Sequence, residues 1–171
     1  MQKHSSKNTS VNTTRLPAVY NKIYWGPYDI GCGQLKTQQI IKEFLDDHGI
    51  KHFYPWDPYH ECINDKLETL RAMKDNDTKK VIVCSCVLNV IDNDETFNKL
   101  IAQICDMSVI REPNGVYRMN PVYIAVYEGD KSGVGRETKK DCWQRNHLLL
   151  LSKIRRENIH NGLRHFLIHQ T

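Results

Sequence analysis

Two glycines, Gly31 and Gly33, closely follow the acidic residue Asp29 at a point where a predicted strand ends and the chain turns. Such a turn can lie against a bound ligand. An apolar and aromatic run over residues 23–30 contains Asp29 near its end, and Gly31-Cys32-Gly33 follows directly. Glycine lets the backbone approach a ligand where a side chain would collide. A helical pattern begins near Thr37, and the first turn of a helix offers unpaired N–H groups and a partial positive charge. The segment therefore predicts a strand, a tight turn and a helix, the arrangement that holds nucleotide-like ligands in α/β sheets.

A second acidic residue, Asp57, stands about 24 residues after the glycines, at the end of another predicted strand. This offset suits a carboxylate that grips the hydroxyls of a ribose. Gly-x-Gly after an apolar run is also typical of an ordinary turn. The third glycine of a dinucleotide-binding loop is missing, and Gln34, Leu35 and Lys36 stand where such a loop carries small residues. The pattern therefore favours a ligand without phosphates over NAD or FAD.

Three segments in this order resemble the class I S-adenosylmethionine-dependent methyltransferases, and most of all their small, divergent members. The segments are Tyr-Asp-Ile-Gly-Cys-Gly at 28–33, Tyr-Pro-Trp-Asp-Pro-Tyr at 54–59 and the run 81–91, and the likeness extends over about residues 22–130. The resemblance implies a seven-stranded, mostly parallel sheet, S-adenosyl-L-methionine at the carboxyl ends of the first strands, and methyl transfer from the sulfonium. The cofactor-binding residues that we expect are Asp29, Gly31, Cys32, Gly33, Gln34, Asp57, Pro58, Tyr59, Ser85 and Val87.

In methyl transfer, the main task of the protein is to align the methyl donor and the acceptor, because the sulfonium is already activated. Asn89, just beyond the predicted central strand, is our candidate catalytic residue, although an Asn there is equally typical of a strand-end cap. Trp143, Gln144 and Arg145 offer an aromatic face, an amide and a charge in one stretch, and we expect them to bind the substrate. A surface loop with Trp143 packed on the core fits the same residues.

The motif Asn-Pro-Val-Tyr at 120–123 is similar to the Asn-Pro-Pro-Tyr motif of amino-methylating DNA enzymes. Valine replaces its second proline, and the motif opens a strand instead of following the central one. A proline at a strand start is ordinary, so we expect a structural role here.

Alternating patterns predict an α/β, Rossmann-like fold, a mostly parallel central sheet with helices on both faces. The predicted strands cover 23–30, 50–56, 81–90, 122–127 and 163–168, and the helices cover 38–48, 67–73, 94–105 and 147–157, with Asp92 or Asp94 as a cap of the third helix. Because the connection from Asp57 to Val81 is short, the third strand of the methyltransferase sheet is expected to be abbreviated or absent. The sheet is thus shortened relative to the seven-stranded fold, and Asp65 and Asp75 become the candidates for the adenine contact.

Composition predicts one globular domain over 20–171 after a flexible amino-terminal arm, 1–19, rich in Ser, Asn, Thr and Lys. The chain has 171 residues, of which 40% are hydrophobic and 26% charged. It has no apolar run of membrane-spanning length, so we expect no membrane contact. Its six cysteines lack a disulfide-rich or zinc-binding pattern. Reduced thiols, no metal and a cytoplasmic location follow as expectations.

The net charge is +4, and basic residues gather late in the chain, around 139–140, 145, 153–156 and 164. Such a tail suits phosphate backbones, although a solvated helix face has the same composition. Three functions fit the sequence. The first is a methyltransferase of unknown acceptor, with nucleic acid slightly favoured. The second is a protein that binds S-adenosylmethionine without methyl transfer, for sequestration, cleavage or regulation, and the third is a nucleotide-binding interaction module.

Overall fold

The computed structural model describes residues 15–75, 80–85, 87–91, 93–127, 136–139, 142–144 and 165–170. The predicted helix at 147–157 and residues 1–14 of the predicted arm lie outside these ranges.

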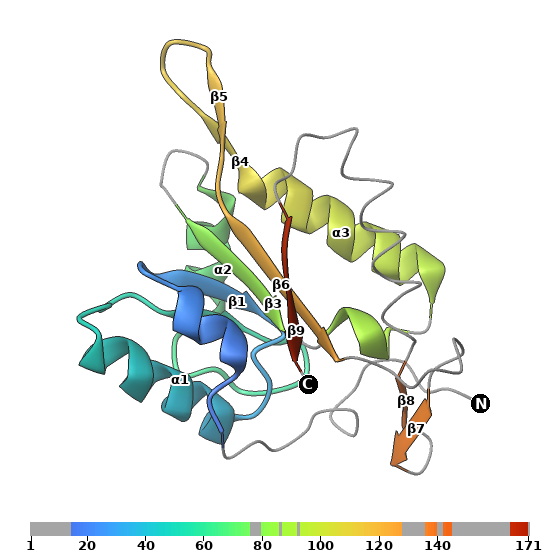
Figure 1. Cartoon of the computed structure of the whole chain (residues 1–171). Helices are drawn as coiled ribbons and strands as arrows, with labels where there is room; N and C mark the ends of the chain where they lie inside the picture. The colour runs from blue at the N-terminus through green and yellow to red at the C-terminus, as the bar shows by residue number, and fades with distance from the viewer. Residues whose placement is uncertain are drawn as a thin grey trace.

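A five-stranded parallel sheet forms the centre of the fold (Figure 1). Its order is β2-β1-β3-β6-β9, and every neighbouring pair is parallel. The chain adds β2 on one side of β1 and then β3 on the other, so the direction of strand addition reverses between β1 and β3. The prediction of an α/β fold with a mostly parallel sheet is confirmed. The strands are β1 (Pro27–Ile30), β2 (Tyr54–Trp56), β3 (Val81–Ser85), β6 (Val122–Tyr127) and β9 (His165–Gln170).

Helices cover both faces of the sheet, because side chains of the strands alternate between two apolar clusters. On β3, Ile82 and Cys84 pack with α2 (Lys66–Lys74) and α3 (Asp94–Ser108). Val81 and Val83 pack on the other face, with α1 (Leu35–Asp47) and the short 3-10 helix η1 (Ala18–Lys22). Figure 1 shows α1 and α3 on opposite sides of the sheet. A central strand covered on both faces explains the unbroken apolar run in its sequence.

Several boundaries differ from those predicted, mostly because a strand-like run continues into a tighter turn. The run 23–30 yields a strand only from Pro27, since η1 ends against Ile23. The run 81–90 yields β3 and then the 3-10 helix η2 (Leu88–Val90). The strand expected over 50–56 is shorter, because only β2 (Tyr54–Trp56) forms there. The helix α1 begins at Leu35, three residues before its predicted start at 38. β6 has the predicted bounds, and β9 replaces the strand expected at 163–168.

The predicted caps of α3 were wrong. Asn93 occupies the N-cap position, and its Oδ1 accepts a hydrogen bond from the backbone N–H of Thr96 at 3.0 Å. Asp94 is the first residue inside the helix, where its charge favours the helix dipole. The helix also continues to Ser108, three residues beyond the predicted end.

Two antiparallel hairpins were not predicted. One joins β4 (Val109–Arg111) to β5 (Tyr117–Met119) and projects away from the sheet in Figure 1. The other joins β7 (Arg136–Lys139) to β8 (Cys142–Gln144). Between β2 and β3 the described residues form α2 and no further strand, so β2 lies at the edge of the described sheet. The shortening relative to a seven-stranded sheet, expected from the spacing of Asp57 and Val81, stays a prediction.

The segment before β1 belongs to the core. Val19 and Tyr20 are fully buried, and they pack with Ile41 and Leu45 of α1. The core thus includes Val19, which the composition placed in the flexible arm. Among the helices of the described residues, none has the length and apolar character that a membrane crossing requires.

Two features of the structure require a residue without a side chain at Gly31, the first residue after β1. Its φ is +75°, a left-handed conformation that costs other residues energy. A Cβ there would also lie 2.3 Å from Cγ2 of Val87, which follows β3. Gly49, after α1, has nearly the same φ of +74°, but a Cβ there would meet nothing within 4 Å. A comparison of substitutions at the two glycines therefore distinguishes the energetic cost of the left-handed conformation from the cost of close packing.

We expect Gly31→Ala to destabilise the fold more than Gly49→Ala. Gly49→Ala should cost about 1–2 kcal/mol for the left-handed conformation. Gly31→Ala should lose about 1–3 kcal/mol more, because the new methyl overpacks against Val87. Urea unfolding of both variants measures the difference, and the Val87→Ala background should remove most of it. Equal losses in the two glycine variants would contradict the close approach of the turn to Val87.

Candidate functional site

The candidate site lies at the carboxyl ends of β1, β2 and β3, around the point where strand order reverses. In open α/β sheets, ligands bind in the crevice beside such a reversal. The turn Gly31-Cys32-Gly33 leaves β1 here, and Ser85 and Val87 come from the end of β3. Asp57 follows β2, which pairs with β1 on its other side. The parallel sheet thus brings three of the predicted segments to one edge.

Backbone hydrogen bonds fasten the glycine turn to the end of β2. The N–H groups of Gly31 and Cys32 both donate to the carbonyl oxygen of Trp56, at 2.7 and 3.3 Å. The N–H of Gly33 donates to Oδ2 of Asp57 at 3.1 Å. All three amides of the turn therefore have partners within the protein. A phosphate group bound by this turn would need such amides free, so the turn itself offers no site for an anion.

Asp57 organises the loop that follows β2. Its Oδ1 accepts hydrogen bonds from the N–H groups of Tyr59 and His60, at 2.8 and 3.0 Å, and the residue is only 5% exposed. Pro58 and Tyr59 are exposed beside it. The carboxylate thus holds both the loop and the glycine turn. Its role in binding a ribose stays a prediction, and Oδ2 accepts one hydrogen bond from the described residues.

Asp29 is a buried carboxyl group with one oxygen satisfied. The Tyr20 hydroxyl donates to Oδ2 at 2.5 Å, whereas Oδ1 has no hydrogen-bond partner among the described residues. Burial raises the pKa of Asp29 to about 7, the hydrogen bond from Tyr20 opposes this rise, and the nearby Asp57 adds to it. Burial and the neighbouring Asp29 also raise the pKa of Tyr20. Two acidic groups therefore lie close together at this edge, and one of them titrates near neutral pH.

Gln38 is a site residue that the sequence analysis missed. Its side chain is fully buried, and its amide nitrogen donates to the carbonyl oxygens of Gly33 and Glu61, each at 2.8 Å. Its Oε1 accepts from the N–H of Ile63 at 3.0 Å. One amide thus connects α1, the glycine turn and the loop after β2. The signal was present in the sequence, because Gln38 shares a helix face with Ile41 and Leu45.

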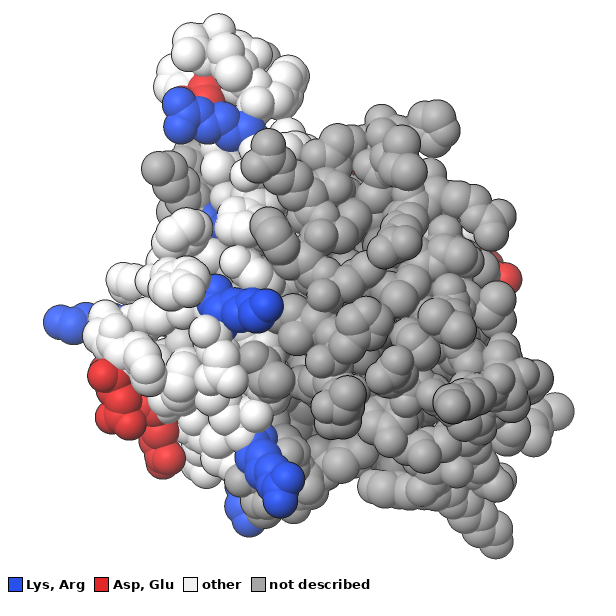
Figure 2. All heavy atoms as spheres, viewed as in Figure 1, with Lys and Arg blue, Asp and Glu red and all other residues white. Residues whose placement is uncertain are grey.

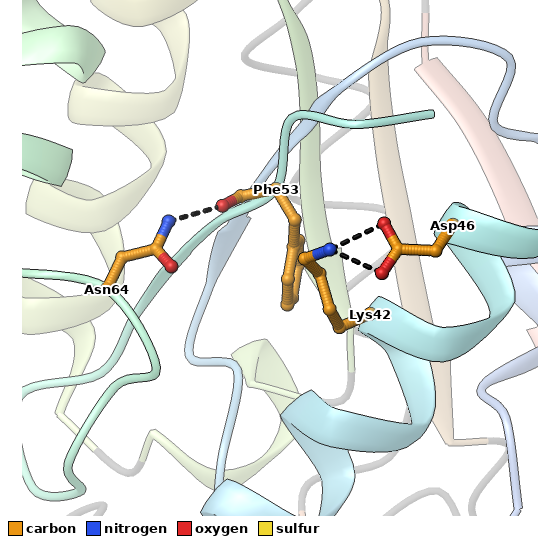
Figure 3. A network of polar contacts seen from close by, with 4 residues as sticks. All are labelled: Lys42, Asp46, Phe53 and Asn64. Atoms are coloured by element: carbon orange, nitrogen blue, oxygen red, sulfur yellow. Dashed lines mark hydrogen bonds and ion pairs between the residues drawn. The ribbon is translucent and has the colours of Figure 1, made fainter. Parts of the chain in front are cut away.

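The other end of the same loop is held by Asn64. Its side-chain nitrogen donates to the carbonyl oxygen of Phe53 at 2.7 Å, as Figure 3 shows. Phe53 is buried one residue before β2. The loop 57–64 is therefore anchored at both ends, and the same figure shows Lys42 and Asp46 paired on the exposed surface of α1.

The remaining predicted cofactor residues surround the turn. Gln34 occupies the N-cap position of α1 without a side-chain capping hydrogen bond. Ser85, the last residue of β3, is partly buried, and Val87 lies against Gly31. The backbone of Asn89 lies in η2, directly after this edge, while its side chain lies outside the described part of the chain.

The β7–β8 hairpin returns the predicted substrate segment to the same region. The backbones of β8, which includes Trp143 and Gln144, and of η2 come within 8 Å of each other. Arg145 lies outside the described residues. The predicted catalytic segment and the predicted substrate segment are thus neighbours in space, and their functional roles stay predictions.

Three polar residues that the sequence analysis considered have structural partners. Asp65 caps α2, because its Oδ1 accepts from the N–H groups of Leu67 and Glu68. Asp75 ends the same helix. Asn120 is buried before β6, where its Oδ1 accepts from the N–H of Lys80 at 2.8 Å. This position is at the amino ends of β3 and β6, opposite the candidate site, which agrees with the structural role expected for the Asn-Pro-Val-Tyr motif.

Metal ligation finds no support in the residues that can be placed. Within them, no group of three or more His, Cys, Asp or Glu side chains is arranged to hold a metal ion.

We expect Asp29→Asn to change how stability depends on pH. The folded protein binds the Asp29 proton up to about pH 7, whereas the unfolded chain releases it near 4. The wild type should therefore lose stability relative to Asp29→Asn, by roughly 2–3 kcal/mol, as the pH rises from about 5 to about 8. Urea unfolding at several pH values measures this loss. The matched control Asp46→Asn removes an exposed carboxylate and should follow the wild-type profile; parallel profiles for all three proteins would contradict the buried acid.

Comparisons with known proteins found no match for this chain. No protein family model, no curated protein and no solved structure matches the chain. The functional argument therefore depends on the geometry of the strand ends described above.

Proposed function

We propose that the chain binds S-adenosyl-L-methionine at the carboxyl ends of β1, β2 and β3 and transfers its methyl group to an acceptor. The observation that carries the proposal is the pairing of two buried acidic residues with a glycine turn that has no amide free for phosphate. Such a site favours a ligand that is cationic and lacks phosphates. S-adenosylmethionine has both properties, since its sulfonium and its amino group are positive.

Asp29 supports a cationic ligand through its unpartnered oxygen. A buried carboxylate that lacks a partner is costly, and an opposite charge within a few ångströms stabilises the ionised form. Oδ1 of Asp29 has no hydrogen-bond partner among the described residues, and Asp57 adds negative charge nearby. A bound cation would satisfy this pair of acids, and the ligand would gain affinity from them.

Asp57 and the loop after it suit the adenosine part. Oδ2 of Asp57 accepts only the N–H of Gly33 among the described donors, so an acceptor position remains for a ribose hydroxyl. Tyr59 is 41% exposed at the same loop, and an exposed ring beside a ribose site can cover a purine. The adenosine would thus lie along the end of β2.

Methyl transfer would take place on the β3 side of the site. η2 follows β3 and includes Asn89, and β8 with Trp143 lies beside it. An amide that accepts from or donates to the acceptor, together with an aromatic face, would align a planar base for attack on the methyl group. Nucleic acid is therefore the acceptor class that we test first. On the face that Figure 2 shows, the described Lys and Arg side chains are scattered and form no single large patch. The late basic residues 145, 153, 155, 156 and 164 lie outside the described ranges.

One observation favours a second candidate, binding of S-adenosylmethionine without transfer. β2 is the edge of the described sheet, so the strand that normally contributes the adenine contact has no counterpart between β2 and β3 among the described residues. Asp65, one candidate for that contact, caps α2 instead. A protein that sequesters or cleaves the cofactor needs no aligned acceptor.

Cofactor binding is tested by calorimetric titration with S-adenosylmethionine. The wild type should bind, and Asp57→Ala should raise the Kd by about tenfold to a hundredfold, the value of one or two hydrogen bonds at a charged group. Asp46→Asn, which removes a carboxylate from the exposed surface of α1, should leave the Kd unchanged. Circular dichroism of each variant at the titration temperature shows that the fold is retained.

The absence of any heat of binding with the folded wild type would exclude both cofactor-dependent candidates and favour an interaction module. An unchanged Kd in a folded Asp57→Ala variant would instead move ribose recognition away from β2.

Transfer is tested by release of S-adenosylhomocysteine during incubation with DNA or RNA. A methyltransferase should release it in proportion to methylated acceptor. Asn89→Ala should slow transfer by about a hundredfold with little change in the Kd for S-adenosylmethionine, because misalignment affects the chemical step. Cofactor breakdown without any methylated acceptor would favour the second candidate.

A further inference from the structure

Two cysteines meet where the glycine turn touches the loop after β2. The Sγ atoms of Cys32 and Cys62 are 4.0 Å apart and share a hydrogen bond. Cys32 is 4% exposed, whereas Cys62 is only partly buried. Both thiols are free, and nothing in the proposed function uses their chemistry.

The contact is fixed by hydrogen bonds to the backbone beside each cysteine. Gln38 donates to the carbonyl oxygens of Gly33, next to Cys32, and of Glu61, next to Cys62. It also accepts from the N–H of Ile63 on the other side of Cys62. The two thiols therefore face each other because a buried amide holds their neighbours, which distinguishes them from a chance surface pair.

The two sulfur atoms differ in reactivity. The hydrogen bond from Cys32 lowers the pKa of Cys62 to about 7, against the effect of its partial burial. Burial raises the pKa of Cys32 well above the usual range for a thiol. A partly exposed thiolate is the form that reacts with oxidants, and a second thiol within reach resolves the product.

We infer that Cys32 and Cys62 form a reversible disulfide when the protein meets a peroxide, and that this bond weakens ligand binding at the glycine turn. The first half is independent of the proposed function. The second half rests on it, because the ligand whose binding changes is S-adenosylmethionine.

The oxidation takes two steps that balance with hydrogen peroxide as the oxidant. The Cys62 thiolate attacks one peroxide oxygen, the O–O bond breaks, hydroxide leaves, and Cys62 becomes a sulfenic acid. Sγ of Cys32 then attacks the sulfenic sulfur, the S–O bond breaks, and water leaves with the Cys32 proton. The hydroxide takes up the proton that Cys62 had released. In total, two thiols lose two electrons and two protons, and the peroxide is reduced to two molecules of water.

The new bond would shift the turn. The sulfur atoms lie 4.0 Å apart, and a disulfide requires about 2.05 Å. Cys32 stands between Gly31, which is packed against Val87, and Gly33, which is bonded to Asp57. Drawing its sulfur toward Cys62 therefore displaces the backbone that borders the ligand.

The experiment treats the full chain with hydrogen peroxide, blocks the remaining thiols, and identifies the cross-linked peptides by mass spectrometry. We expect an intact-mass loss of about 2 Da, for two hydrogens, and a peptide that joins Cys32 to Cys62. Dithiothreitol should restore the original mass. Calorimetry should give a Kd for S-adenosylmethionine that is about tenfold weaker after oxidation and recovers on reduction.

Two variants and a control keep the test independent of folding defects. Cys62→Ser, at a partly exposed position, should lose both the mass change and the response of the Kd. Cys32→Ser should leave a sulfenic acid at Cys62 that dimedone traps. Cys105→Ser, at a partly buried position in α3, should behave as the wild type.

The outcomes separate this inference from the proposed function. No Cys32–Cys62 peptide, or a peptide that joins other cysteines, would overturn the disulfide. A correct disulfide with an unchanged Kd would overturn its effect on the site. A reduced protein that binds no S-adenosylmethionine would refute the proposed function, while the peptide map would still decide the disulfide.

Discussion

The attachment of the glycine turn to the end of β2 is the constraint on which the candidate site depends. Three backbone N–H groups of the turn point into the protein, toward Trp56 and Asp57, instead of toward a ligand. Gln38 adds hydrogen bonds to the same turn and to the loop after β2. These three amides are therefore not free to bind an anion, and the proposed ligand contacts at the turn rest on the carboxylates instead. Two buried acidic residues, Asp29 and Asp57, thus lie at the end of the sheet where strand order reverses, and the proposal of a cationic ligand rests on them.

That combination also explains why polar side chains are buried here. Asp29, Asp57 and Gln38 are all buried, and two of them have their hydrogen-bonding groups satisfied by backbone. Asp29 is the exception, because Tyr20 satisfies one oxygen and leaves the other without a partner in the described structure. A buried unsatisfied group lowers stability and is tolerated where it serves a function. Near the glycine turn, the buried oxygens without a partner among the described residues are thus Oδ1 of Asp29 and Oγ1 of Thr37 in the first turn of α1.

The sequence predicted the sheet and the residues at the carboxyl ends of its strands better than it predicted the hydrogen bonds between them. Alternating apolar runs located β6 and α1–α3 closely, because strands and helices that pack on a shared core have a clear period. The same runs overextended β1 and β3, since Ile23, which directly follows the 3-10 helix η1, and Leu88, in the 3-10 helix η2, are buried apolar residues outside the strands. Asp29, Gly33 and Asp57 were identified from spacing. The hydrogen bonds of Tyr20 and Gln38 were missed because their partners are 9 residues away in one case and as far as 25 in the other. The place of Gln38 on the buried face of its helix indicates that it is buried, but it does not indicate which groups it binds.

The chain order of the site has a consequence for biosynthesis. Every described contact that shapes the glycine turn involves residues between Tyr20 and Val87, whereas β6 and β9 extend the sheet afterwards. These earlier residues leave the ribosome first, before the residues of β6 and β9. The described contacts of the glycine turn can therefore form from the first part of the nascent polypeptide, before β6, the β7–β8 hairpin and β9 emerge.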